Sequence, residues 1–336
     1  MKAVNPTRNK IIKWLPGLVI SLIVIYLLAR ISNWDQLSLA FQEYRLADFA
    51  LAVGLTTGFL ISRSQGWRIL LGKQATYSQS FFTISIGYLL NNLLPLRAGE
   101  IGRAVVMGRA TNAGPAKVLS SIVIERAFDL VIAASLVLST LPLALSMEWL
   151  RPIAYVIMVV VICVLLCLFF MAKNPQKIKM WIQNISNKNN PILRFIGPQL
   201  NGLLDGFAVM NKPSNLFLGF FWITVSWFFS ILQYYLMMIP FSTGAHFWWG
   251  AFANSVLAMG VAIPSAPAAL GVFEGSLVAA LSILGIDNSP ALAFAIFLHF
   301  TQFIVTGIFG LWGLIREGRS FSTLLADLQV MPKNSE

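Results

Sequence analysis

The amino-acid sequence predicts an all-α integral membrane protein that crosses the bilayer several times. Apolar residues make up 57% of the 336 positions, whereas charged residues make up only 11%. A soluble domain carries about 25% charged residues, so this chain lacks the polar surface that a soluble globular protein needs. Its hydrophobicity also excludes a disordered chain. Apolar stretches close to the ~20 residues that a helix needs to cross a bilayer recur along the whole sequence.

Six stretches are predicted to cross the membrane completely. In chain order they are 14–31, 48–61 with a helical continuation to 71, 116–141, 152–172, 215–239 and 289–315. The first stretch follows a basic N-terminus, and no small-residue cleavage site comes after it, which favours an uncleaved signal anchor.

Two further apolar segments, 78–95 and 247–285, are interrupted by proline, glycine and polar residues. The distribution of Lys and Arg indicates how they are placed, because cytoplasmic loops carry an excess of these residues. With a cytoplasmic N-terminus, most of the 24 basic residues, Arg63 and Arg103 among them, fall on the cytoplasmic side only if both segments are re-entrant hairpins. We therefore expect about six full spans, two re-entrant hairpins and two cytoplasmic termini.

This topology divides a single transmembrane domain, 1–336, into two halves, about 10–145 and about 150–315, before a cytoplasmic tail at 316–336. The halves repeat one order of elements in opposite orientations. Both hairpins carry a Pro-x-x-x-Gly pattern followed by a glutamate, from Pro95 to Glu100 and from Pro267 to Glu274. Interrupted segments at matching positions of inverted halves indicate a transporter's binding site near the middle of the membrane.

The net charge and the sequence motifs exclude several classes of function. The net charge of +11 is explained by membrane orientation and by contact with anionic lipid surfaces, so no nucleic-acid partner is expected. Cys163 and Cys167 lie in one apolar span and predict neither a disulfide nor a metal site. The sequence contains no catalytic or nucleotide-binding motif, so we expect no enzyme activity, no cofactor and no metal.

Polar and helix-breaking residues gather in the first interrupted segment: Asn91, Asn92, Pro95, Arg97, Gly99, Glu100 and Arg103. Pro95 and Gly99 are predicted to break the hairpin, which leaves free backbone N–H groups that favour an anion. Arg97, Glu100 and Arg103 recur every three residues, so two guanidinium groups flank one carboxylate. The remaining positive charge and the planar donors suit a phosphate.

A second cluster, Glu125-Arg126-x-x-Asp129, lies well inside an expected span. Glu125 and Asp129 are four residues apart and share a helix face, so they repel each other unless a cation from elsewhere lies between them. Arg97 or Arg103 is the predicted partner. The alternative is a purely structural network that neutralises these charges and fixes the helix register.

The third cluster lies in the second interrupted segment, where Pro264, Pro267 and Gly271 are predicted to shape a hairpin around Glu274. A carboxyl group deep in the membrane is costly and indicates function by default. Three polar residues of the last span could reach it: His299, Thr301 and Gln302. Two states of Glu274 remain open, a neutral hydrogen-bonded carboxyl and one that titrates during transport.

In this order the three clusters resemble the motifs of the lysylphosphatidylglycerol synthase transmembrane family, which is also described as flippase-like. The similar segments are the run from Asn91 to Arg103, Glu125-Arg126-x-x-Asp129-Leu130 and Pro267-x-x-x-Gly271-Val272-Phe273-Glu274. The chain departs from the family at Ala268-Ala269, where a Gly-Gly pair is usual. The resemblance implies a membrane domain that handles anionic or aminoacylated phospholipids or lipid-linked intermediates. The aminoacyltransferase domain of full-length synthases has no counterpart here, so lysyl transfer is not expected of this chain alone.

We therefore expect a flippase of the cytoplasmic (inner) membrane whose partner is a phospholipid or lipid-linked head group. Arg97 and Arg103 would bind its phosphate, Glu100 would orient them, and the second cluster would support that face. A partner synthase or a homo-oligomer is compatible with this role. Two alternatives remain: a membrane glycosyltransferase or other lipid-modifying enzyme with its acid among Asp35, Glu43 and Asp48, and a non-transporting accessory subunit of a lipid pathway.

Overall fold

The computed structural model describes residues 6–72, 74–94, 98–111, 114–145, 213–263 and 265–318, together with the isolated positions 156, 159 and 180. These residues form helices and turns and contain no β-strand, as expected for an all-α protein. The predicted span 152–172, apart from positions 156 and 159, lies outside the described residues, as do Pro95, Arg97 and Pro264.

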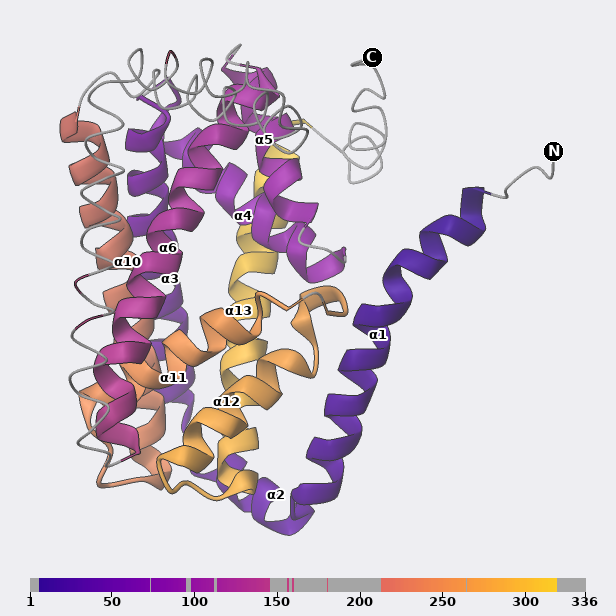
Figure 1. Ribbon diagram of the computed structural model, residues 1–336, viewed down its shortest axis with the longest axis vertical. Helices are drawn as coiled ribbons and strands as arrows, with labels where there is room; N and C mark the ends of the chain where they lie inside the picture. The colour runs from indigo at the N-terminus through magenta and orange to yellow at the C-terminus, as the bar shows by residue number, and fades with distance from the viewer. Residues whose placement is uncertain are drawn as a thin grey trace.

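Long helices account for five of the six predicted spans (Figure 1). They are α1 (Pro6–Ile31), α3 (Leu46–Leu70), α6 (Pro115–Ala144), α10 (Pro213–Met238) and α13 (Asn288–Arg316). Within the described part of the chain, four helices are long and apolar enough to cross a membrane, or five if α1 and the short helix after it form one bent span. The chain is therefore a multi-pass membrane protein.

The short helix α2 (Trp34–Gln42) fills the connection between α1 and α3 and lies at 89° to α1. Its N-cap is Asn33, whose side-chain oxygen accepts hydrogen bonds from the backbone N–H groups of Asp35 and Gln36 at 3.0 and 3.2 Å. The backbone N–H of Asn33 donates to the Ser289 hydroxyl at 2.8 Å, which ties this corner to the start of α13.

Each interrupted segment forms a pair of short helices. The first pair is α4 (Tyr77–Leu93) and α5 (Ala98–Ala110), and the second is α11 (Phe247–Gly260) and α12 (Val272–Ile283), joined through the 3-10 turn η2 (Pro267–Ala269). The members of each pair pack against each other, and none of the four reaches the ~20 residues of a full span. The first pair extends beyond the apolar segment 78–95, because its returning arm is α5, which ends at Ala110.

The two helix pairs lie in opposite parts of the bundle (Figure 1). α4 and α5 lie in the upper half of this view and α11 and α12 in the lower half, while α13 passes both pairs along its length. α4 also packs against η2, so the turn of the second pair contacts the first pair. This arrangement brings the two interrupted segments together although they are far apart in the sequence.

The most extensive helix contact is between α3 and α10. Small residues allow their close approach, since a methyl group on Gly66 would lie only 3.2 Å from the carbonyl oxygen of Gly219. α6 packs against α3, α5 and α10, and charged residues of the first half meet at this junction.

Candidate functional site

Six charged side chains form a compact group, here called the ionic cluster. It comprises three arginines and three acids from α3, α5 and α6: Arg63, Glu100, Arg103, Glu125, Arg126 and Asp129. The formal charges of these six residues balance. The positive excess expected at this position therefore depends on Arg97, which lies outside the described residues.

Glu125 is the centre of the ionic cluster and is fully buried, with an exposed fraction of 0%. Its Oε1 accepts from Arg63 Nε at 2.7 Å and from Arg126 Nη2 at 3.1 Å, and its Oε2 accepts from Arg103 Nη2 at 2.5 Å. A buried carboxylate is stable only with such charged partners. Arg103 thus contacts Glu125, but the prediction that Arg97 or Arg103 lies between Glu125 and Asp129 is wrong, because another arginine holds that place.

The cation between Glu125 and Asp129 is Arg63 of α3. Besides Glu125, it donates from Nη1 to Asp129 Oδ1 at 3.1 Å, and its Nη2 pairs with Asp129 Oδ2. Asp129 Oδ1 also accepts from Trp227 Nε1 at 2.9 Å. Arg63 and Arg103, both counted among the cytoplasmic-side basic residues, are only 3% and 4% exposed, so each is buried in the helix bundle. The signal for Arg63 was present, since it lies in the predicted continuation of an apolar span.

Aromatic side chains enclose the arginines. The guanidinium carbon of Arg103 lies 4.2 Å from the centre of the Trp67 ring, within the range of a cation–π contact. Trp67 is fully buried and donates from Nε1 to the Ser121 hydroxyl at 3.1 Å. These contacts fix Arg103 toward Glu125.

One edge of the ionic cluster is open. The side chains of Arg126 and Glu100 are 35% and 19% exposed, and Arg126 Nε lies 3.9 Å from Glu100 Oε1. Within the described part of the chain, three polar atoms here are buried without a hydrogen-bond partner: Glu100 Oε2, Arg103 Nε and Arg126 Nε. Buried polar atoms are normally paired, so this edge can accept a polar ligand.

The two asparagines of the first hairpin turn form hydrogen bonds within the protein, whereas a simple anion site would leave the backbone N–H groups free. α5 begins at Ala98, as expected, but the backbone N–H of Gly99 donates to Asn91 Oδ1 at 2.8 Å. Asn92 points to α13 and donates from Nδ2 to the Thr306 hydroxyl at 3.0 Å. Asn91 therefore accepts from one of the first N–H groups of α5, and Asn92 connects the hairpin to the last helix.

Glu274 lies at the start of α12 and pairs with His299 of α13, the contact that the sequence allowed. Its Oε1 lies 2.6 Å from His299 Nδ1, and its Oε2 accepts the backbone N–H of Gly271 at 2.7 Å. Thr301 instead donates to the Phe297 carbonyl oxygen within α13. Gln302 lines a separate cavity.

The departure from the family pattern at Ala268-Ala269 does not prevent a tight turn. Both alanines adopt positive φ angles, 56° and 55°, and Gly271 follows with a φ of 80°. An alanine occupies this left-handed region at a cost that glycine does not have. The hairpin therefore keeps a geometry suited to glycine while carrying two alanines.

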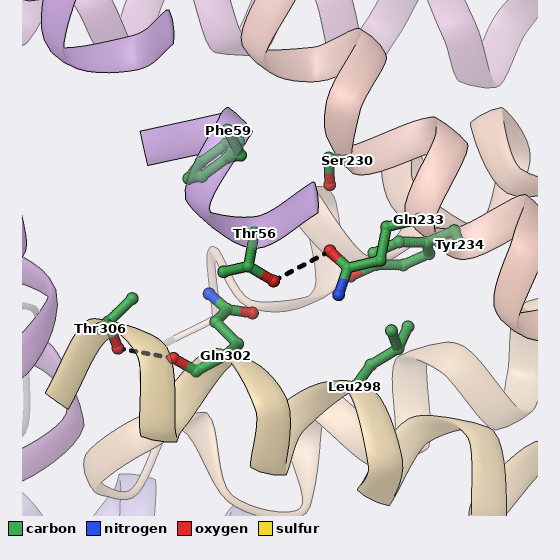
Figure 2. Close-up of a pocket in the computed structure, with 8 residues that line it drawn as sticks. All are labelled: Thr56, Phe59, Ser230, Gln233, Tyr234, Leu298, Gln302 and Thr306. Atoms are coloured by element: carbon green, nitrogen blue, oxygen red, sulfur yellow. Dashed lines mark hydrogen bonds between the residues drawn. The ribbon is translucent and has the colours of Figure 1, made fainter. Parts of the chain in front are cut away.

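A small polar cavity, which the sequence did not predict, lies between α3, α10 and α13 (Figure 2). Its volume is about 40 Å³, enough for water molecules. The lining side chains are uncharged: Thr56, Phe59, Ser230, Gln233, Tyr234, Leu298, Gln302 and Thr306. Thr56 donates to Gln233 Oε1 at 3.2 Å. Three separate helices supply these residues, so no local pattern marks them.

Comparison with known proteins identifies relatives of the chain. The family described as the lysylphosphatidylglycerol synthase TM region matches residues 14–310. The UPF0104 membrane protein MJ1078 of Methanocaldococcus jannaschii is 26% identical over 223 residues, which cover 66% of this chain and 91% of that protein. No solved structure matches the chain.

Proposed function

The chain belongs to the lysylphosphatidylglycerol synthase transmembrane family, and from this premise we propose that it binds an anionic or aminoacylated phospholipid, or a lipid-linked intermediate, and moves it across the cytoplasmic membrane. The family match supports a role with lipids, whereas the transported lipid and the movement itself are proposals. No cofactor and no catalytic step are part of this function.

The open edge of the ionic cluster carries the proposal. Arg126 is partly exposed, and among the described residues its own Nε, Arg103 Nε and the acceptor Glu100 Oε2 have no hydrogen-bond partner. A phosphate bound there would accept hydrogen bonds from guanidinium groups, which match its geometry. Arg97, one residue before α5, is the proposed second contact. The burial of Arg103 and its pairing with Glu125 support a positioning role for Arg103 rather than direct contact with the head group.

We place the two helix pairs as re-entrant hairpins in a chain with about six spans, inverted halves and cytoplasmic termini. The short helices of each pair and their opposite positions in the bundle (Figure 1) support this topology. The contact between α4 and η2 supports a path in which the hairpins move against each other and expose the bound head group to either side in turn.

An enzyme that modifies lipids is the main rival. Its candidate acids have ordinary structural settings: Asp35 and Glu43 are exposed around α2, and Asp48 accepts the backbone N–H of Arg45 at 2.8 Å at the start of α3. Asp35 and Glu43 therefore have the setting of surface residues, and Asp48 has that of a helix-capping residue. Incubation with a labelled lipid-linked sugar separates the two functions, because only an enzyme changes the mass of the product.

Mass spectrometry of lipids that co-purify with the protein tests the proposed binding. The wild-type protein is expected to retain anionic phospholipid. Arg126→Gln is expected to reduce that lipid about ten- to hundredfold, since a hydrogen bond to a charged group contributes about 1.5–3 kcal/mol. Arg30→Gln, at the exposed end of α1, is the matched control. Equal anionic lipid in the wild-type protein and in Arg126→Gln would contradict the site.

A further inference from the structure

A buried acid–imidazole pair, separate from the ionic cluster, lies at the turn of the second hairpin. Glu274 and His299 are each 9% exposed and lie 2.6 Å apart, and the Phe273 ring stacks on the imidazole with a centroid distance of 4.1 Å. Histidine is the side chain that ordinarily changes its charge between about pH 5 and pH 8. The pair can therefore hold one exchangeable proton.

No described charge compensates this pair from a neighbouring element. α12 packs against α1, α11 and α13, and η2 packs against α4. The other ionisable side chains described on these elements and at their caps are exposed, lie at helix ends or are tyrosines of α4: Tyr26, Arg30, Tyr77, Tyr88, His246, Asp287, Arg316 and Glu317. An ionised Glu274 beside a neutral imidazole carries a net charge of −1, and a bound proton makes the pair neutral. In a medium of low dielectric constant, the pair with a net charge of −1 is much less favourable than the neutral pair.

The carboxylate also holds the backbone of the turn. Glu274 Oε2 accepts the N–H of Gly271, directly after the two alanines with positive φ. Residues held in such conformations persist only when their surroundings fix them. A doubly charged pair, imidazolium and carboxylate, strengthens the contact between α12 and α13 and so fixes the turn. A lone buried carboxylate favours entry of water and opening of the turn.

The turn is connected to the first hairpin by two routes. The first is the direct packing of η2 on α4, whose last turn carries Asn91 and Asn92. The second is one stripe of α13: His299, Gln302 and Thr306 are spaced by three and four residues and share a face. Gln302 and Thr306 line the polar cavity (Figure 2), and the Thr306 hydroxyl accepts from Asn92 Nδ2.

We propose that Glu274 and His299 bind one proton, that the protonated pair holds the turn of α11 and α12 closed against α4, and that release of the proton to water frees this turn. Lipid movement is then coupled to proton binding at a site that contacts no lipid phosphate. This coupling rests on the function proposed above, whereas the proton binding does not.

The chain contains two histidines, His246 and His299, so imidazole titration can be measured directly. Protein with ¹⁵N-labelled histidine in nanodiscs of phosphatidylglycerol and phosphatidylethanolamine gives two imidazole signals, and His299→Gln identifies them. Between about pH 5 and about pH 8, we expect the His299 signal to report exchange of the proton that the pair binds. Glu274→Gln should alter this response, whereas Glu43→Gln, an exposed control, should leave it unchanged. A single protonation state throughout this range, or an unchanged response in Glu274→Gln, would overturn the proton site.

A transport measurement tests the coupling. Short-chain fluorescent phosphatidylglycerol is extracted with albumin from proteoliposomes held at about pH 6 or about pH 8. The wild-type rate is expected to differ roughly fivefold or more between the two, and Glu274→Gln and His299→Gln should move lipid at one rate at both. The same pH dependence in the wild type and in both variants would overturn the coupling. No lipid movement by the wild type at either pH would overturn the proposed function and the coupling together, and the titration would still decide the proton site.

Discussion

Arg63 contacts both carboxylates of α6 and is the residue on which the ionic cluster depends most. Without it, Glu125 keeps Arg103 and Arg126, whereas Asp129 keeps Arg126 and the indole of Trp227. The partly exposed Arg126 would then be the cation that remains between the two carboxylates, and two arginines would face three acids in the cluster. Whether Arg63 reaches both carboxylates depends on how α3 is rotated against α6. Hydropathy and residue spacing carry no information on that rotation.

Replacing Arg63 by methionine is expected to lower the free energy of unfolding by about 3–5 kcal/mol, the usual cost of removing one partner from a buried ion pair. Thermal unfolding in detergent, followed by tryptophan fluorescence, measures this loss. The double variant Arg63→Met/Asp129→Leu should recover part of the stability, because the remaining two arginines and two acids of the cluster again balance in charge. Equal stability of Arg63→Met and the wild type would show that the cluster does not depend on this contact.

At the scale of single elements, the first hairpin depends on a close approach of α4 and α5. A methyl group on Gly99 would collide with the carbonyl oxygen of Gly87 and with the Asn91 side chain. Gly99→Ala is expected to destabilise the protein by about 1–3 kcal/mol. Gly54→Ala is the control, since a methyl group there meets nothing within 4 Å and alanine favours a helix. A Gly99→Ala protein as stable as Gly54→Ala would contradict this packing.

The turn of the second hairpin allows the opposite test. Ala268→Gly and Ala269→Gly remove the cost of a left-handed alanine, so each is expected to raise stability by up to about 1 kcal/mol despite the larger freedom of unfolded glycine. Ala266→Gly is the matched control, because its φ of −57° suits alanine, and it should lower stability. The comparison requires only melting temperatures. Loss of stability in all three variants would argue against the left-handed turn.

Element existence follows from the sequence more reliably than element boundaries. Five long helices match predicted apolar stretches because a bilayer span requires many consecutive apolar residues. The length of α5 does not follow from the sequence, because its 13 residues include Glu100, Arg103 and Arg109, which are typical of a charged loop until their partners are known. α2 had a usable signal, Asn33 as N-cap followed by Asp35 in the first turn. No sequence signal predicts the cavity, since its lining residues come from three separate helices.

At the scale of the whole molecule, the proposed topology requires the two helix pairs to enter the membrane from opposite sides. In a background of Cys163→Ala and Cys167→Ala, Thr111→Cys at the end of α5 should react with a membrane-impermeant maleimide only from the cytoplasmic side. Thr243→Cys, in the exposed turn before α11, should react only from outside. Labelling of both positions from one side would contradict the inverted halves.

In the proposed function, the open edge of the ionic cluster binds a phospholipid that the protein moves across the membrane. The most direct test is the rate at which fluorescent phosphatidylglycerol crosses proteoliposomes that contain the wild-type protein, Arg97→Ala, Arg126→Gln or the control Arg30→Gln, each first shown to be folded. We expect rapid crossing with the wild type and the control, and crossing close to that of empty vesicles with Arg97→Ala and Arg126→Gln. Crossing at the wild-type rate in both cluster variants would contradict the claim, as would a wild-type rate equal to that of empty vesicles.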